Sequence, residues 1–144
     1  MQWSLVGSEM CIRDRLKEID NLRSKIESLR KGVVATYAER LETRITELFG
    51  DRELDPVRLH SEVAILAEKA DIAEELVRIQ SHQTQFFELL QRPSSGRKME
   101  FLLQEFGREF NTIASKSQNA EIQKLVVNAK FELEKIKEQV ANIE

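Results

Sequence analysis

The chain has 144 residues, a length that suits one domain or a piece of a larger protein, and its formal net charge is −3. Charged residues make up 33% of it and aromatic residues 6%, a composition typical of long helices joined by few turns. The acidic balance excludes a basic field over the whole chain, so any contact with nucleic acid has to be local or supplied by an assembly. No apolar run approaches the length that crosses a bilayer.

The first fifteen residues, "MQWSLVGSEMCIRDR", differ from the rest of the chain. They contain its only Trp and only Cys, and they lack the order of a signal peptide. The segment from Leu5 to Asp14 resembles the in-frame translation of a sequencing-library adaptor. We interpret residues 1–15 as an adaptor-derived artefact, unstructured or an extension of the next helix; the alternative is a genuine N-terminal tail. Cys11 then says nothing about redox compartment, and we expect the natural protein to continue upstream of Leu16.

Apolar spacing predicts two long helices in the next part of the chain. Residues 16–49 form the first, because apolar residues recur at alternating spacings of three and four, as in a heptad pattern: Ile19, Leu22, Ile26, Leu29 and Val33. The stretch "GDRELDP" predicts a turn, in which Gly50 ends the first helix and Pro56 opens the next. The second helix is expected over residues 56–91.

The loop "RPSSG" at residues 92–96 separates these from two further helices, expected over residues 97–116 and from residue 119 to the end. In the last helix the apolar residues keep an unbroken spacing of four and three, which requires another helix against them: Ile122, Val126, Ala129, Leu133, Ile136, Val140 and Ile143. The sequence therefore predicts an all-α fold of long antiparallel helices in a bundle with coiled-coil character.

Ionisable residues form a stripe along the second helix when it is placed on a helical wheel. They border the apolar side, where burial shifts pKa values, and thus predict the edge of a groove: Asp71, Glu74, Glu75, Arg78 and His82. Ion pairs along one helix and an interfacial histidine are the alternative interpretation.

The third helix divides cleanly into an apolar and a polar face. The polar face carries amides, carboxylates and cations: Arg97, Lys98, Gln104, Glu105, Arg108, Glu109, Asn111, Thr112, Ser115 and Lys116. Phe101 is the only large apolar residue on that face. An aromatic side chain among cations and amides is typical of base stacking on single-stranded nucleic acid, and packing against another helix is the alternative.

Three ordered stretches of the chain resemble one known family: "RLHSEVAILAEKADIAEELVRIQSHQTQF" (58–86), "GRKMEFLLQEFGREFNTIASKS" (96–117) and "KIKEQVANIE" (135–144). They are similar to the C-terminal domain of the YicC/YloC family of bacterial endoribonucleases. We accordingly divide the chain into residues 1–15, a long helical arm over 16–57, and a YicC-like helical domain over 58–144. Family members carry a separate N-terminal domain, which is missing here, and Gly107 stands where the family usually has Asn.

The resemblance implies metal-dependent cleavage of RNA by a cytoplasmic protein that forms a ring-like homo-oligomer, with a hexamer as one candidate. It also implies that the protein binds neither a membrane nor DNA. Hydrolysis of RNA needs an activated nucleophile and charge stabilisation, which Mg²⁺ or Mn²⁺ on carboxylates supplies. We expect carboxylates of the second and third helices to face each other across a groove.

The residue roles that follow from these patterns and from the resemblance form three sets. Candidates for catalysis are Glu75, His82, Glu105 and Glu109, with His82 as general acid or base. Candidate ligands of the divalent metal are Asp71, Glu74, Glu75 and Glu109. Candidates for RNA binding are Arg78, Arg97, Lys98, Phe101, Gln104, Arg108, Asn111 and Lys116. The competing hypothesis is a non-catalytic oligomerisation scaffold or RNA-decay adaptor module, with these stripes as inter-subunit ion pairs.

Overall fold

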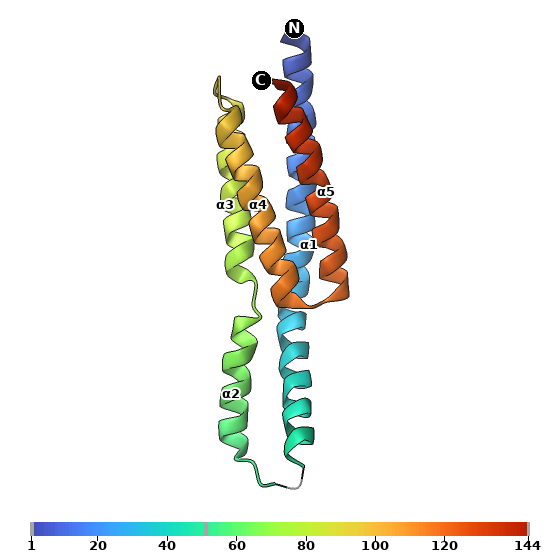
Figure 1. Cartoon of the computed structure of the whole chain (residues 1–144), viewed down its shortest axis with the longest axis vertical. Coiled ribbons are helices and arrows are strands. Elements are labelled where there is room, and N and C mark those ends of the chain that lie inside the picture. Colours follow the sequence, from blue (N-terminus) through green and yellow to red (C-terminus); the bar gives the residue numbers. More distant parts are fainter. Residues whose placement is uncertain (1, 51, 144) are drawn as a thin grey trace.

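The computed structural model describes the backbone of residues 2–50 and 52–143, and the side chains of residues 11–50 and 52–142. The described chain forms five helices (Figure 1), namely α1 (Gln2–Phe49), α2 (Pro56–Lys69), α3 (Ala73–Leu90), α4 (Gly96–Ser117) and α5 (Ala120–Ile143). It contains no strand within those ranges, so the all-α prediction is confirmed. No helix in the described ranges combines the length and the apolar character that crossing a membrane requires.

The helices make a four-helix bundle with a two-helix extension (Figure 1). The first half of α1 packs against α3 and α5, and α4 packs against α3 and α5 on the opposite side of the bundle. In each of these contacting pairs the two helices run antiparallel. The second half of α1 continues past the bundle and pairs with α2 alone. We call residues 34–49 of α1 together with α2 the hairpin. Its inner face buries few side chains, among them Val63 and Ala67, whereas Leu48, Phe49 and Ile65 are exposed.

The core of the bundle is built from the seams that the sequence predicts. All described members of the α5 seam are buried, from Ile122 to Val140, and the side chain of Ile143 lies outside the described residues. Ile19, Leu22 and Ile26 of α1 are buried against them, and Phe86, Phe106 and Phe110 fill the space between α3 and α4. Burial of apolar area of this extent is the main term that stabilises the bundle.

The expected single helix over residues 56–91 is wrong, because the chain breaks between Lys69 and Ala73. Ala70 ends α2: its N–H donates to the carbonyl of Ala67 at 3.0 Å, and the N–H of Asp71 donates to the carbonyl of Glu68 at 3.1 Å. The Asp71 carboxylate then accepts two hydrogen bonds from Arg30 of α1, at 3.0 and 3.1 Å. This contact joins residues 41 positions apart, so helical periodicity, which is a local signal, does not reveal it. The break removes Asp71 from the stripe on which the helical wheel placed it.

The segment of residues 2–15 continues α1 without interruption. Ile12 is buried in the core, and Arg15 Nη1 lies 2.9 Å from Glu132 Oε2 of α5. The adaptor origin of these residues stays a prediction, because packing of a segment does not reveal where its gene sequence came from.

Gly107 lies in the middle of α4, and a Cβ added there meets no atom within 4 Å. We therefore expect Gly107→Ala to raise the free energy of unfolding by about 1 kcal/mol, since glycine disfavours the helix and alanine fits the space. Chemical denaturation measures the change. Gly50→Ala is the matched control, because Gly50 has a φ of +57° and the same substitution there is expected to destabilise. A loss of stability in Gly107→Ala would contradict the expectation.

Candidate functional site

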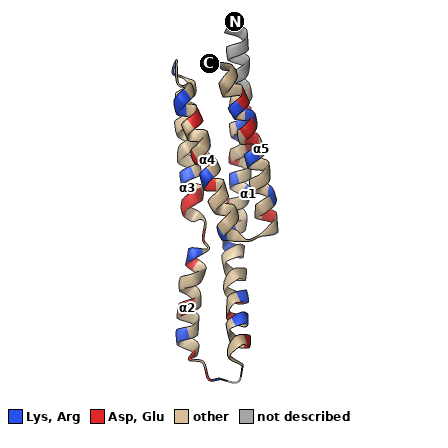
Figure 2. Cartoon of the chain, viewed as in Figure 1, with Lys and Arg blue, Asp and Glu red and all other residues tan. Residues whose placement is uncertain are grey.

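Four charged residues of α3 and α4 form a connected group at the end of the two helices nearest the hairpin (Figure 2). Arg78 Nε donates to Glu109 Oε1 at 2.9 Å, and Arg78 Nη2 lies 3.4 Å from Glu75 Oε1. Lys116 Nζ donates to the same Glu75 oxygen at 2.7 Å. We call Glu75, Arg78, Glu109 and Lys116 the Glu75–Glu109 cluster.

Helix geometry brings this cluster together. Glu75 and Arg78 lie three residues apart, and Glu109 and Lys116 seven apart, so each pair shares one face of its helix. The Glu75 side chain is only 2% exposed and that of Glu109 is 8% exposed. A buried carboxylate is unstable without a partner, so both depend on the two cations. Arg78 thus brings Glu75 of α3 and Glu109 of α4 to one shared edge.

The hydrogen bond to Glu109 raises the pKa of Arg78 above its ordinary value. A basic group with a raised pKa contributes stability at every pH below its ordinary pKa, and loses it only as pH rises through the raised value. The pairing of Arg78 with the two carboxylates therefore persists throughout the neutral range.

Two groups near the cluster are buried without hydrogen-bond partners. Glu75 Oε2 has none, and neither ring nitrogen of His82 has one. The His82 ring instead meets Phe106 edge to face, with 5.8 Å between ring centroids. Unpaired buried polar atoms are costly, and such atoms concentrate where a ligand or a proton is exchanged. His82 lies about one turn beyond Arg78 on α3, on the same side of the helix as the cluster.

The candidate metal ligands are not brought together as a set. Asp71 is paired with Arg30, and the exposed Glu74 approaches only Arg78, at 3.7 Å. Within the described residues no group of three or more His, Cys, Asp or Glu side chains is placed to hold a metal ion. Glu105, the remaining catalytic candidate, is half-buried on α4. The metal assignment stays a prediction.

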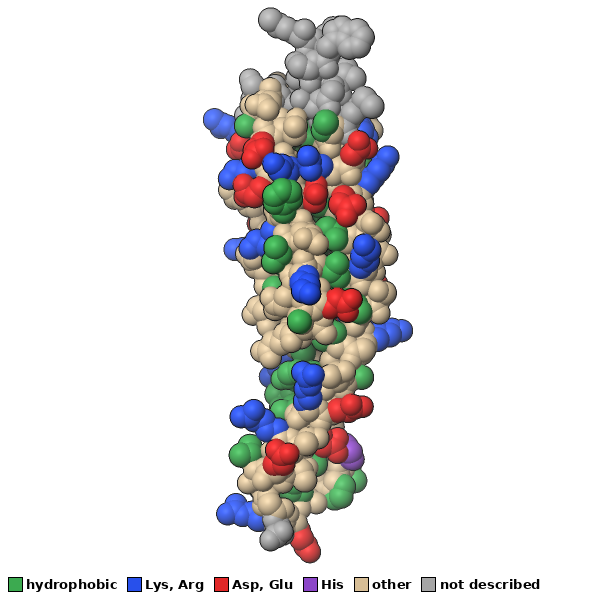
Figure 3. Space-filling model, turned by 90° about the vertical axis from the view of Figure 1, so that its right-hand side faces the viewer, with side chains coloured by type: hydrophobic (Ala, Val, Ile, Leu, Met, Phe, Trp, Pro, Cys, Tyr) green, Lys and Arg blue, Asp and Glu red, His purple; other side chains and the backbone are tan. Residues whose placement is uncertain are grey.

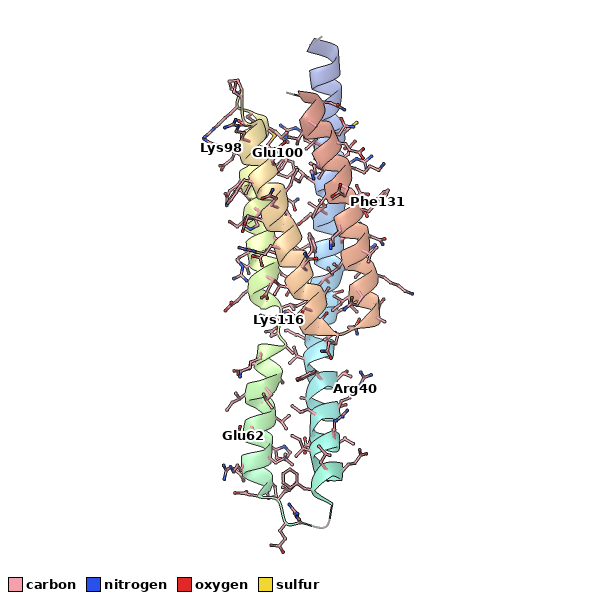
Figure 4. All side chains as sticks on the ribbon, viewed as in Figure 1. Arg40, Glu62, Lys98, Glu100, Lys116 and Phe131 are labelled. Atoms are coloured by element: carbon pink, nitrogen blue, oxygen red, sulfur yellow. The ribbon has the colours of Figure 1, made fainter. Side chains whose placement is uncertain are left out.

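The candidate RNA-binding residues are divided between two edges of α4. Arg78 and Lys116 belong to the cluster on the α3 edge, whereas Asn111 Oδ1 accepts a hydrogen bond from Lys130 of α5 at 2.7 Å. Figure 4 shows Lys98 and Lys116 at opposite ends of α4. The others are exposed along the helix between these edges or near its start: Arg97, Lys98, Gln104 and Arg108.

Phe101 is 62% exposed on the surface of α4, so it does not pack into the interior of this chain. It lines a shallow hollow between α3 and α4 with Gln85, Arg92 and Lys98, and Glu88 adds one carboxylate to the same lining. An exposed ring beside two cations and an amide has the composition of a surface on which a base stacks.

Two residues that sequence reasoning missed are Arg30 and Lys130. Each pairs with a predicted site residue outside its own helix: Arg30 with Asp71, 41 positions away, and Lys130 with Asn111, 19 positions away. No local pattern marks either residue. Helical spacing shows only which residues lie on the same face of one helix, and it does not show which other helix that face meets.

Charges of both signs alternate on the face of the bundle that Figure 3 shows, with apolar side chains between them. On α5, Val127 and Phe131 are exposed, and the Lys135 ammonium lies 5.2 Å from the centre of the Phe131 ring. This face carries no field of a single sign, which agrees with the net charge of −3.

The chain is therefore an all-α domain of the helical-bundle class. It has buried carboxylates paired with cations at the edge between α3 and α4. Comparison with known proteins then identifies the family. A family model described as "Endoribonuclease YicC-like, C-terminal" matches residues 26–144, so the chain belongs to the YicC-like endoribonuclease family and represents its C-terminal domain.

Two curated relatives agree with this assignment. The chain is 48% identical over 130 residues to "Probable endoribonuclease YicC" of Clostridioides difficile (strain 630), an alignment that covers 87% of this chain and 44% of that protein. It is 38% identical over 134 residues to "Probable endoribonuclease YicC" of Haemophilus influenzae (strain ATCC 51907 / DSM 11121 / KW20 / Rd), covering 92% of this chain and 46% of the relative. The chain thus spans less than half the length of these relatives.

Proposed function

We propose that this chain is the C-terminal part of an endoribonuclease that cleaves RNA, and that the edge between α3 and α4 contributes to its active site. The observation that carries the proposal is the Glu75–Glu109 cluster, two buried carboxylates held by Arg78 and Lys116 in a family named for RNA cleavage. Buried, paired ionisable groups in contact with an exposed polar face are the usual setting of catalytic chemistry.

We propose that Glu75 and Glu109 hold a divalent cation together with the phosphates of a bound RNA. The described residues form no cage of three carboxylates, but Mg²⁺ is usually bound through one or two carboxylates together with substrate phosphates. Glu75 and Glu109 supply two carboxylates on facing helices, and Glu75 Oε2 makes no hydrogen bond. A Mg²⁺ or Mn²⁺ ion bound there would supply charge neutralisation at the phosphate and an acidified water.

Other residues of this chain would then bind phosphate, transfer a proton and stack a base. Lys116 and Arg78, which neutralise the carboxylates in the free protein, would turn to phosphate oxygens when RNA is bound. His82, whose ring nitrogens have no partner in the described structure, would transfer a proton near neutral pH. Phe101 would stack a base farther along α4, and Arg97 and Lys98 would hold the backbone beside it.

Removal of divalent metal tests this proposal. In a full-length protein that contains this chain, we expect Mn²⁺ to support cleavage of a structured RNA and excess EDTA to abolish it, with activity restored on re-addition. A gel-based assay of end-labelled RNA measures this. We expect the 144-residue chain alone to be weak or inactive, because its relatives are more than twice as long. Cleavage that persists in EDTA would overturn the metal role, and no cleavage under any condition would overturn the nuclease.

A second candidate function is a non-catalytic scaffold, because each buried carboxylate of the cluster already has a cationic partner. The exposed Val127 and Phe131 of α5 would then contribute to contacts between copies in a homo-oligomeric ring. A full-length protein that assembles in analytical ultracentrifugation but never cleaves RNA would favour this alternative.

A further inference from the structure

We propose that the cavity between α1 and the turn that connects α4 to α5 binds a phosphate group. The cavity has a volume of about 230 Å³, several times the roughly 30 Å³ that a water molecule occupies in the liquid. Its polar lining comes from two parts of the chain that are far apart in sequence: Thr36, Tyr37, Arg40 and Arg44 of α1, and Ser117 at the end of α4 with Gln118 and Asn119 of the turn. We call it the junction cavity, because it lies where the hairpin leaves the bundle (Figure 4, near Arg40).

Two arginines give the junction cavity its charge. Arg40 and Arg44 are four residues apart on α1, so they lie on one face, where two like charges repel each other. The acidic residues of this part of α1 line a different hollow on the helix: Glu39, Glu42 and Glu47. Glu42 points to His60 of α2, with 3.6 Å between Oε1 and Nδ1. No described carboxylate therefore pairs with Arg40 or Arg44, and an anion between them would relieve their repulsion.

The start of α5 adds a second source of positive potential. Asn119 caps this helix, its Oδ1 accepting a hydrogen bond from the N–H of Ile122 at 2.9 Å. The unpaired N–H groups of a first helical turn and the helix dipole both favour an anion. Glu121 of this turn is exposed and does not line the cavity.

The hydroxyl group of Ser117 also indicates a ligand, and this indication does not depend on the charge of the arginines. Ser117 is one of the residues that line the junction cavity, it is only 4% exposed, and its buried Oγ has no hydrogen-bond partner among the described residues. A serine in a helix ordinarily donates to the carbonyl four residues earlier, and this one does not. An unpaired buried hydroxyl is destabilising, and an oxygen-rich anion bound in the cavity that Ser117 shares with Arg40 and Arg44 would supply the missing acceptor.

Phosphate is the chemical class that these donors recognise, because it offers several acceptor oxygens to guanidinium, hydroxyl and helix N–H groups together. The phosphate could come from the backbone of RNA or be free in solution. Ser117 directly follows Lys116 of the Glu75–Glu109 cluster, so an RNA strand could reach both sites at this end of α4. Only this RNA source rests on the proposed function; binding of phosphate itself does not.

Inorganic phosphate tests the site without RNA, metal or catalysis. In ¹H–¹⁵N spectra of the whole chain, we expect phosphate to shift the amide signals of Ser117, Gln118 and Asn119, and to raise Tm. The double variant Arg40→Gln/Arg44→Gln should lose both effects. The matched control Arg52→Gln/Arg58→Gln removes two exposed arginines, one from the turn between α1 and α2 and one from α2, and should keep both effects. Equal responses of the two double variants, or no response of the wild type, would overturn the proposal.

Ser117→Ala separates binding from folding. Removing the unpaired hydroxyl should leave Tm without phosphate unchanged or higher, while phosphate affinity falls several-fold. A lower Tm without phosphate together with unchanged phosphate affinity would assign Ser117 a structural role and contradict its part in the site.

A single-stranded RNA oligonucleotide distinguishes the two phosphate sources. If RNA is the source, Arg40→Gln/Arg44→Gln should weaken RNA binding and reduce the slope of log K against log salt by about 1.4, which corresponds to two lost phosphate contacts. The control double variant should change the slope less. If RNA binding is unchanged although the phosphate response is lost, the ligand is free phosphate. Because no cleavage is measured, failure of this site and failure of the proposed nuclease activity are seen in different experiments.

Discussion

Glu75→Gln in a full-length protein is expected to lower kcat/KM for RNA cleavage by about 10²-fold or more. The substitution keeps the shape of a side chain that is 2% exposed but removes its charge. On the proposed function this eliminates one of the two carboxylates that neutralise a metal ion at the phosphate. It also leaves Lys116 and Arg78 without the Oε1 carboxylate that both approach. Cleavage of a labelled RNA at saturating and limiting Mn²⁺ measures the loss.

The control for this variant is Glu62→Gln, which removes the same charge from an exposed position on α2 and is expected to cleave at the wild-type rate. Thermal denaturation of both variants separates chemistry from folding. Glu75→Gln should lose about 1 to 2 kcal/mol of stability, because a charged hydrogen bond becomes a neutral one. It should nevertheless stay folded at the assay temperature. Wild-type cleavage by a folded Glu75→Gln protein would show that the cluster is structural, as the scaffold hypothesis holds.

The seams of α1 and α5 were predictable because each follows from spacing within one helix. A residue every three or four positions lies on one face whatever the rest of the chain does, and burial of that face follows from the amount of apolar area on it. The break between α2 and α3 was not predictable in this way. At the break, Asp71 accepts two hydrogen bonds from Arg30, which lies 41 positions earlier in the chain. Tertiary contacts of this kind override local helical preference.

In the candidate site, too, features that follow from spacing within one helix were predictable, and features that depend on contacts between helices were not. Periodicity placed Glu75, Arg78 and Glu109 at the edges of apolar faces, and those edges meet in the structure. Periodicity could not show that Asp71 turns to α1 or that Asn111 turns to Lys130 of α5, because both depend on which helices are neighbours. The junction cavity is a further case: its arginines and Ser117 lie more than 70 residues apart, and no motif connects them.

Phe106→Ala is expected to have the largest effect on stability, a loss of about 3 to 5 kcal/mol in the free energy of unfolding. The Phe106 side chain is 0% exposed, and its ring contacts those of Phe86, at 6.5 Å between centroids, and His82, at 5.8 Å. Truncation removes this burial and leaves a cavity between α3 and α4 beside the catalytic candidate. Urea denaturation measures the loss, and Phe106→Leu, which fills most of the cavity, should recover more than half of it.

Phe101→Ala is the matched control, since it makes the same substitution on the same helix at a position that is 62% exposed. We expect its stability to stay within about 0.5 kcal/mol of the wild type, because surface substitutions cost little. Its affinity for single-stranded RNA should fall, since a stacking aromatic contributes about 1 to 3 kcal/mol per base. The two phenylalanines, five residues apart, would thus separate two roles of α4: Phe106 packs the helix against α3, and Phe101 is proposed to contact RNA on the outer face. A Phe101→Ala protein that unfolds early, or binds RNA as the wild type does, would contradict that division.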